Sequence, residues 1–187
     1  MIPNSDGIDL ISCSNATISD CHIYAGDDAI VVAGYGWHQG DPGFKNIKAP
    51  SRNVNVTNCV LQSRSSGIRI GGHDQNPMSD YNFSNITIFD SNRGINISVS
   101  DSCSLENVSF DNIHIETRLH TGDWWGQGEP INITAMQLLP DKPVIGKIRN
   151  LYFNNITSVG ENSVVIIADP QTVIENVYFN NFDFIMR

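Results

Sequence analysis

A seven-residue pattern recurs six times along this chain: Asn, an apolar residue, any residue, an apolar residue, any residue, Asp or Asn, and then a small or apolar residue. The copies start 38, 32, 22, 43 and 26 residues apart, at Asn15, Asn53, Asn85, Asn107, Asn150 and Asn176. Each copy alternates apolar and polar residues with a period of two, which is typical of a strand with one buried face. The Asn and Asp residues at its ends predict turns, because they tolerate the left-handed region.

A second short apolar run follows each of the first five copies of the pattern, and an earlier run stands before the first copy. The runs are 28–32, 66–70, 93–97, 131–135 and 163–167, with the earlier one at 6–10. A unit this short cannot bury its apolar face alone, so neighbouring units must stack to form a core. The sequence therefore predicts an all-β protein, a right-handed parallel β-helix with coils of about 22 residues or longer.

The first strand of each coil is expected to stack in one parallel sheet, at 16–20, 54–58, 86–90, 108–113, 151–155 and 177–181. A sandwich or propeller would instead need two-residue hairpin turns, and the one Asp-Gly pair, at Asp6 and Gly7, does not join two strands. We expect a single β-helix domain over residues 1–187 that lacks N-terminal coils. An open coil at its end is a candidate surface for self-association.

The composition excludes several classes of partner. The net charge is −9, with 11 Lys and Arg against 20 Asp and Glu, which argues against binding to nucleic acid or to an anionic membrane surface. An acidic polysaccharide would have to be bound by local Arg or Lys residues. The four cysteines have no CxxC spacing, so we expect neither a metal site nor disulfides, and the thiols are predicted to be buried.

Three aspartates stand where successive coils begin their second strand. Asp6 and Asp28 each lie two residues before an isoleucine, and Asp27 precedes Asp28. Equivalent positions of neighbouring coils lie about 4.8 Å apart, so the three carboxylates are expected to share one patch and to raise at least one pKa. Hydrolysis of a glycosidic bond needs one protonated carboxylic acid and one carboxylate.

The two motifs that contain these aspartates resemble glycoside hydrolase family 28, the polygalacturonases. They are Asn4-Ser5-Asp6 and Gly26-Asp27-Asp28, with 21 residues from Asp6 to Asp27, and the resemblance extends from residue 4 to about residue 139. It implies inverting hydrolysis of a pectic polysaccharide or oligosaccharide without a metal or cofactor. Asp27 would be the general acid, Asp6 and Asp28 would activate water, and Asn4 would contact substrate. An extracellular or periplasmic location is expected, although no signal peptide is visible.

The chain departs from the family pattern at its basic residues. The family's Gly-His-Gly aligns with 65–67, where Ser66 replaces the His, and its Arg-Ile-Lys aligns with 96–98, where both basic residues are missing. Arg69, Arg93 and His73 are candidates to supply the lost substrate contacts. The alternative is that Arg69 and Arg93 are only outward-facing polar residues of alternating strands.

A Gly-rich segment at residues 117–130 interrupts the repeat and contains Trp124 and Trp125. Aromatic rings stack on the apolar faces of sugars, so both residues are candidate substrate contacts. Alternatively, both cover the flank of the core.

Two rival functions stay open. A β-helix that has lost catalysis and only binds carbohydrate, or has a structural role, would explain the missing basic residues. A pectate-type lyase is the less favoured alternative, since it needs calcium ligands and an Arg base.

Overall fold

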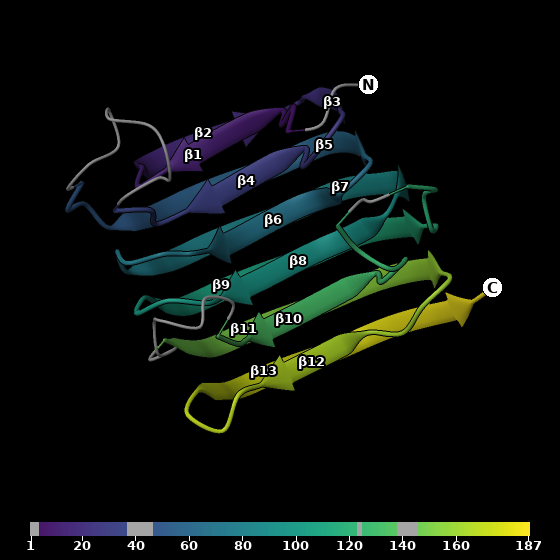
Figure 1. The fold of residues 1–187 in the computed structure, drawn as a ribbon. Coiled ribbons are helices and arrows are strands. Elements are labelled where there is room, and N and C mark those ends of the chain that lie inside the picture. The colour runs from purple at the N-terminus through teal and green to yellow at the C-terminus, as the bar shows by residue number, and fades with distance from the viewer. Residues whose placement is uncertain (1–3, 37–46, 123–124, 138–145) are drawn as a thin grey trace.

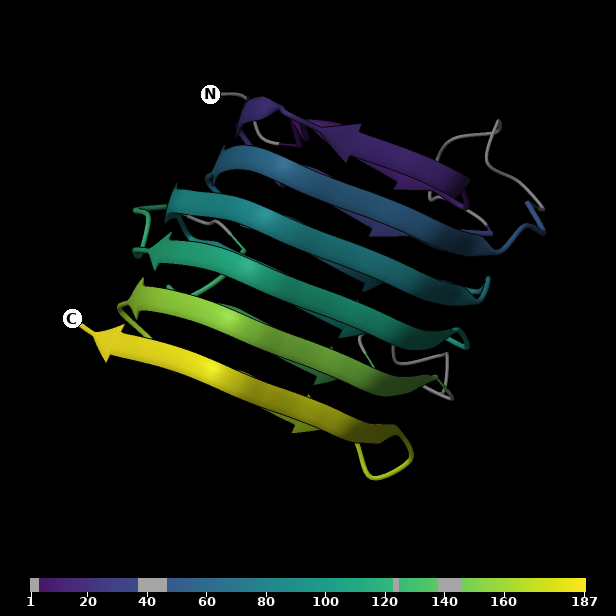
Figure 2. The same ribbon diagram turned by 180° about the vertical axis from the view of Figure 1, so that it is seen from behind.

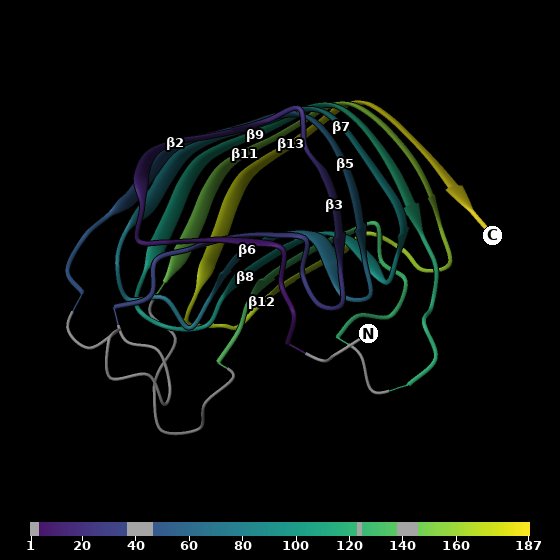
Figure 3. The ribbon, with the colours of Figure 1, turned by 90° about the horizontal axis from the view of Figure 1, so that it is seen from above.

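The computed structural model describes residues 4–36, 47–122, 125–137 and 146–187. They form two parallel sheets that face each other across an apolar core (Figures 1 and 3). Sheet A consists of β1 (Ile8–Ile11), β4 (Ile30–Ala33), β6 (Ser66–Gly72), β8 (Arg93–Val99), β10 (Ile131–Ala135) and β12 (Val165–Ala168). Sheet B consists of β2 (Ser14–Ser19), β3 (His22–Ala25), β5 (Ser51–Ser63), β7 (Met78–Ser91), β9 (Ser104–Thr117), β11 (Lys147–Gly160) and β13 (Val173–Met186).

From β4 onward the chain alternates between the two sheets, so each further coil adds one strand to each of them. All the pairings between the described strands are parallel. The strands of sheet B follow one another in chain order from the N-terminal to the C-terminal coil (Figure 2). This arrangement confirms the predicted parallel β-helix. No helix among the described residues has the length and apolar character needed to cross a bilayer.

The strands of sheet B are longer than the sequence predicts, because the expected turns are bends inside continuous strands. In β5, for example, Asn53 and Asn58 both have a positive φ of 56°, and the strand continues through each of them. The left-handed conformation was therefore predicted correctly, but the interpretation of these residues as turns was wrong. Asn and Asp reach this region at lower cost than other L-residues, and stacking along the sheet holds them there.

The register of one repeat copy also differs from the prediction. Asp80, and not Asn85, stands opposite Asn53 and Asn107, since Tyr81 pairs with Val54 and Val108. Asn85 instead belongs to a second column of left-handed residues, with Asn58 and Asn112. The predicted strand 86–90 does lie in sheet B. The pattern predicted two columns of left-handed residues five positions apart, but its third copy was placed five residues too late, at Asn85 in place of Asp80.

The core consists of ladders of like side chains. In sheet A one ladder contains Ile8, Ile30, Ile68, Ile95 and Ile131. In sheet B the rings of Phe83, Phe110, Phe153 and Phe179 stack with centroids 5.0, 4.8 and 4.8 Å apart. All four cysteines are free, as predicted, but only Cys59 and Cys103 are fully buried. Burial of these ladders is the main source of stability, because a single coil exposes its apolar face.

Candidate active site

Asp6 and Asp28 stand at the same position of successive coils. Ile8 pairs with Ile30, so the aspartates two residues before them lie side by side where β1 and β4 begin. The backbone N–H of Gly7 donates to the carbonyl oxygen of Asp28 at 2.9 Å. Asp27 is tied to the same coil, since its N–H donates to the carbonyl oxygen of Ser5 at 3.2 Å. The structure thus brings the three predicted carboxylates to one edge of sheet A.

The carboxylate of Asp28 is fixed from the side of the next coil. Its Oδ1 accepts a hydrogen bond of 2.8 Å from the backbone N–H of Ser66, and its Oδ2 lies 3.4 Å from Nη1 of Arg69. The residue is only 3% exposed. A buried carboxylate in this position needs such partners, and both come from β6.

Asp27 is nearly as buried as Asp28, but no ion pair with Arg69 is seen for its carboxyl among the described residues. Burial, and then the neighbouring charge of Asp28, raise the pKa of the Asp27 carboxyl above its usual range. Hydrogen bonds from the Ser65 side chain and the Asn4 backbone oppose that rise, as does the more distant charge of Arg69. Asn4, predicted as a substrate contact, thus contacts the proposed acid through its backbone.

Asp6 is the second carboxyl of the patch whose pKa is raised. Burial is the largest cause and the charges of Asp9, Asp28 and Asp27 add to it, so that the pKa rises to about 7. The raised pKa values of Asp6 and Asp27 favour protonated carboxyls beside Asp28, whose carboxylate is paired with Arg69. This is the combination that acid–base hydrolysis requires.

Arg69 is the cation nearest to this patch among the described residues. Its Nε donates to the carbonyl oxygen of Gly71 at 3.1 Å, and its Nη2 donates to the hydroxyl of Tyr35. It therefore lies on the same face as the carboxylates, with much of its hydrogen-bonding capacity already used. Whether it also binds substrate stays a prediction.

Two residues around Arg69 were missed by the sequence reasoning. Tyr35 accepts the Arg69 bond, and burial raises the Tyr35 pKa to about 12, so the phenol stays neutral. Asp74 is fully buried, and its Oδ1 accepts a 2.5 Å hydrogen bond from the N–H of Gly34. Burial raises the pKa of Asp74 to about 7, against the Gly34 and Gly72 backbone bonds and the charge of Arg69. Both residues follow strand ends, and no motif marks them in the sequence.

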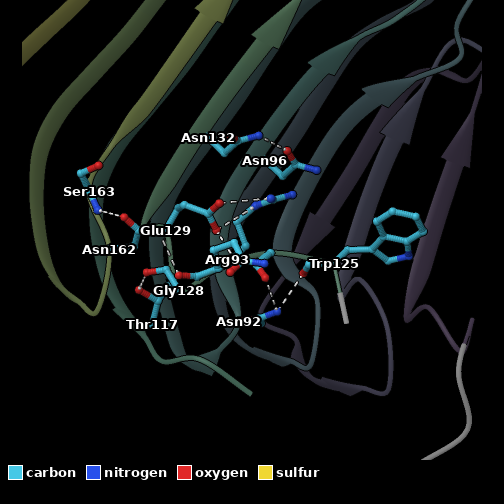
Figure 4. Close-up of polar contacts among 12 residues, drawn as sticks. Asn92, Arg93, Asn96, Thr117, Trp125, Gly128, Glu129, Asn132, Asn162 and Ser163 are labelled. Atoms are coloured by element: carbon cyan, nitrogen blue, oxygen red, sulfur yellow. Dashed lines mark hydrogen bonds and ion pairs between the residues drawn. The ribbon is translucent and has the colours of Figure 1, made fainter. Parts of the chain in front are cut away.

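His73 and Arg93 make their described contacts away from the three carboxylates. Nδ1 of His73 lies 2.9 Å from Oγ of Ser100. The guanidinium of Arg93 lies 3.3 Å from each carboxylate oxygen of Glu129, on the next coil (Figure 4). Arg93 pairs with Ser66 and so stands in the column of Asp28, but its charge is already paired with Glu129.

Trp125 is 72% exposed, so it does not cover the flank of the core. Its backbone carbonyl accepts a hydrogen bond of 3.0 Å from Nδ2 of Asn92, and the same amide donates to the carbonyl of Gly126 at 3.2 Å (Figure 4). Trp124 lies outside the described residues. Within those residues no group of three or more His, Cys, Asp or Glu side chains is placed to bind a metal ion.

Comparison with known proteins agrees with the parallel β-helix fold. The model of the family described as "Glycosyl hydrolases family 28" matches residues 2–184. An exopolygalacturonase of Arabidopsis thaliana is 33% identical over 103 residues, which cover 45% of this chain and 24% of the relative. A second Arabidopsis thaliana protein, named "Probable polygalacturonase", is 35% identical over 83 residues, 36% of this chain and 18% of the relative. The matches thus span a quarter or less of these relatives. No solved structure matches significantly.

Proposed function

The chain belongs to glycosyl hydrolase family 28, and from this premise we propose that it cleaves α-linked galacturonic acid or a related pectic polysaccharide or oligosaccharide by inverting hydrolysis. The observation that carries the proposal is the convergence of Asp6, Asp27 and Asp28 at one edge of sheet A, with a raised pKa at Asp6 and Asp27. Since pectic polymers are found outside the cell, we further propose an extracellular or periplasmic location.

In the proposed reaction Asp27 donates its proton to the glycosidic oxygen as the bond to the anomeric carbon breaks. A water molecule attacks that carbon from the opposite face and gives its proton to Asp28, while Asp6 positions the water. Burial raises the pKa of Asp27, which favours its protonated form, and the ion pair with Arg69 holds the Asp28 oxygens in place. Attack from the face opposite the leaving group inverts the anomeric configuration.

A second candidate is a carbohydrate-binding β-helix without turnover. The observation in its favour is that Ser66 stands where the family pattern has His, and contacts Asp28 only through its backbone. In addition, the positions of the family's Arg and Lys are held by Asn96 and Ser98.

The first test is product analysis on pectic oligosaccharides of defined length. We expect new reducing ends, and we expect proton NMR of the first-formed product to show an anomer opposite to that of the bond cleaved. A retained anomer contradicts the mechanism. Binding without any new reducing ends, by folded protein, favours the second candidate.

The pH dependence of activity is a further prediction. Because the pKa of Asp6 is raised to about 7, this carboxyl loses its proton as the pH rises through about 7, and its ionisation then adds a negative charge to the patch. We therefore expect kcat/KM to fall as the pH rises through about 7. The residual activity of Asp6→Asn should lose this descending limb. A wild-type profile that rises or stays flat between pH 6 and pH 8 contradicts this role of Asp6.

A further inference from the structure

A second polar cluster stands at the same edge of sheet A as the three carboxylates. Ser66 pairs with Arg93, and Asp28 bonds to Ser66, so Asn92 falls in the column of Asp27 and Ser65. Arg93 N–H donates to the Ser65 carbonyl at 2.8 Å. β8 is two strands from β4, about 10 Å along the axis. The cluster of Asn92, Arg93, Glu129 and Trp125 is therefore placed to contact a sugar chain that occupies the carboxylate patch.

The charge of Arg93 is compensated inside this cluster. The two carboxylate oxygens of Glu129 each lie 3.3 Å from a guanidinium nitrogen of Arg93. The Arg93 side chain is 15% exposed and the Glu129 side chain 7%. Glu129 also accepts a 2.6 Å hydrogen bond from the N–H of Gln127. Arg93 holds the pKa of Glu129 below its usual range, although burial alone would raise it. A substrate carboxylate would have to displace a buried, hydrogen-bonded partner, which is costly.

The column that contains Arg69 continues into uncharged amides, at Asn96 and Asn132. Asn96 lies next to Arg69 in the register, and its Oδ1 accepts a 2.8 Å hydrogen bond from Nδ2 of Asn132. These residues are 9% and 6% exposed. Amides can bond to hydroxyl groups, but they offer no charge to a carboxylate.

Trp125 is exposed although the backbone around it is fixed. Besides the two bonds from Asn92, the carbonyl of Gln127 accepts from Asn162, and that of Gly128 accepts from Thr117 at 2.7 Å. The indole extends away from the Arg93–Glu129 pair, on the side of the N-terminal coils (Figure 4). An exposed aromatic ring on a backbone that is held in this way can stack on a sugar without first ordering the segment that carries it.

We propose that the cluster of Asn92, Arg93, Glu129 and Trp125 is a subsite for an uncharged sugar ring, which stacks on Trp125 and needs no carboxylate. The inference rests on the proposed function, since it names the class of sugar that binds at β8, two strands from the Asp28 strand β4. Arg93 is then a positioning residue: it fixes Glu129, which holds the backbone of the Trp125 segment.

The test uses two ligands of equal length, an oligogalacturonide and its carboxyl-reduced counterpart, in which every carboxylate is a primary alcohol. Binding is measured by calorimetry in the Asp27→Asn background, to prevent cleavage. We expect Glu129→Gln to free Arg93 and to tighten binding of the oligogalacturonide about tenfold, because a hydrogen bond to a charged group becomes available. Binding of the reduced ligand should not tighten, because that ligand offers no charge to the freed guanidinium. The matched control Arg93→Gln/Glu129→Gln lacks the freed charge, so the gain in oligogalacturonide binding should disappear, and any loss caused by the loosened Trp125 segment should affect both ligands alike.

Trp125→Ala should weaken binding of the reduced ligand about three- to tenfold, and Trp125→Phe should restore most of it. Because the side chain is exposed, this variant is expected to fold normally, so it keeps the test valid if Glu129→Gln is unstable. Selective loss of oligogalacturonide binding in the double variant would show that Arg93 already binds a carboxylate, and would overturn the proposal. An unchanged affinity in Trp125→Ala would overturn it too. If folded parent binds neither ligand, the proposed function falls with it, whereas binding of both without these selective effects removes only the neutral subsite.

Discussion

The Asp27→Asn protein should turn over pectic oligosaccharides about a hundred- to ten-thousand-fold more slowly than wild type, with unchanged folding. The amide has almost the same shape, but it cannot donate the proton that the leaving oxygen needs. The Ser65 and Asn4 contacts to the side chain limit any rearrangement, because both partners belong to the described fold around it. Turnover is measured as reducing-end release, and folding as the far-UV circular dichroism spectrum and the unfolding midpoint.

Two comparisons make this result specific. Asp6→Asn and Asp28→Asn should also lower turnover steeply, but combining either with Asp27→Asn should not multiply the losses, since the three groups act as a unit. Asp111→Asn is the matched control: Asp111 is exposed in sheet B and accepts a 2.9 Å hydrogen bond from Asn155. Its turnover should equal that of wild type. Near-normal turnover in Asp27→Asn would exclude Asp27 as the acid.

Phe110→Ala should lower the free energy of unfolding by about 3–5 kcal/mol. Phe110 is fully buried and stacks on Phe83 at 5.0 Å and on Phe153 at 4.8 Å, so truncation removes two ring contacts and opens a cavity in the middle of the ladder. The neighbouring strands β7 and β11 cannot close this cavity, because parallel pairing with β9 fixes their backbones. Urea unfolding followed by circular dichroism measures the effect.

The matched control is Tyr152→Ala, one residue before Phe153 and on the opposite face of β11. Its ring is 39% exposed and stacks only on Tyr178 among the described rings, at 5.3 Å. We expect a loss of about 1 kcal/mol, typical of one stacked pair at a surface. Equal losses in the two variants would mean that the inner aromatic ladder is not a principal source of stability.

The predicted fold came from local patterns that fit a parallel β-helix better than a sandwich or a propeller. Period-two alternation in units that recur along the chain requires stacking, and the structure has that stacking in both sheets. The equivalence of Asp6 with Asp28 also followed from the sequence, because each stands two residues before a core isoleucine of its ladder. Positions defined by distance from a core residue are preserved when coils stack, so the three carboxylates could be found.

The register of the third coil and the partners of the basic residues were decided only by the tertiary structure. Asp80 and Asn85 both fit the start of a repeat, and only pairing of β7 with both neighbours selects Asp80. Arg93 has a clear column in the sequence, but its partner Glu129 comes from an irregular segment 36 residues later. Tyr35 and Asp74, which lie near Arg69, also come from segments that follow strand ends. Side chains from loops between coils have no periodicity, so their neighbours depend on how each loop closes, and the sequence pattern does not specify that.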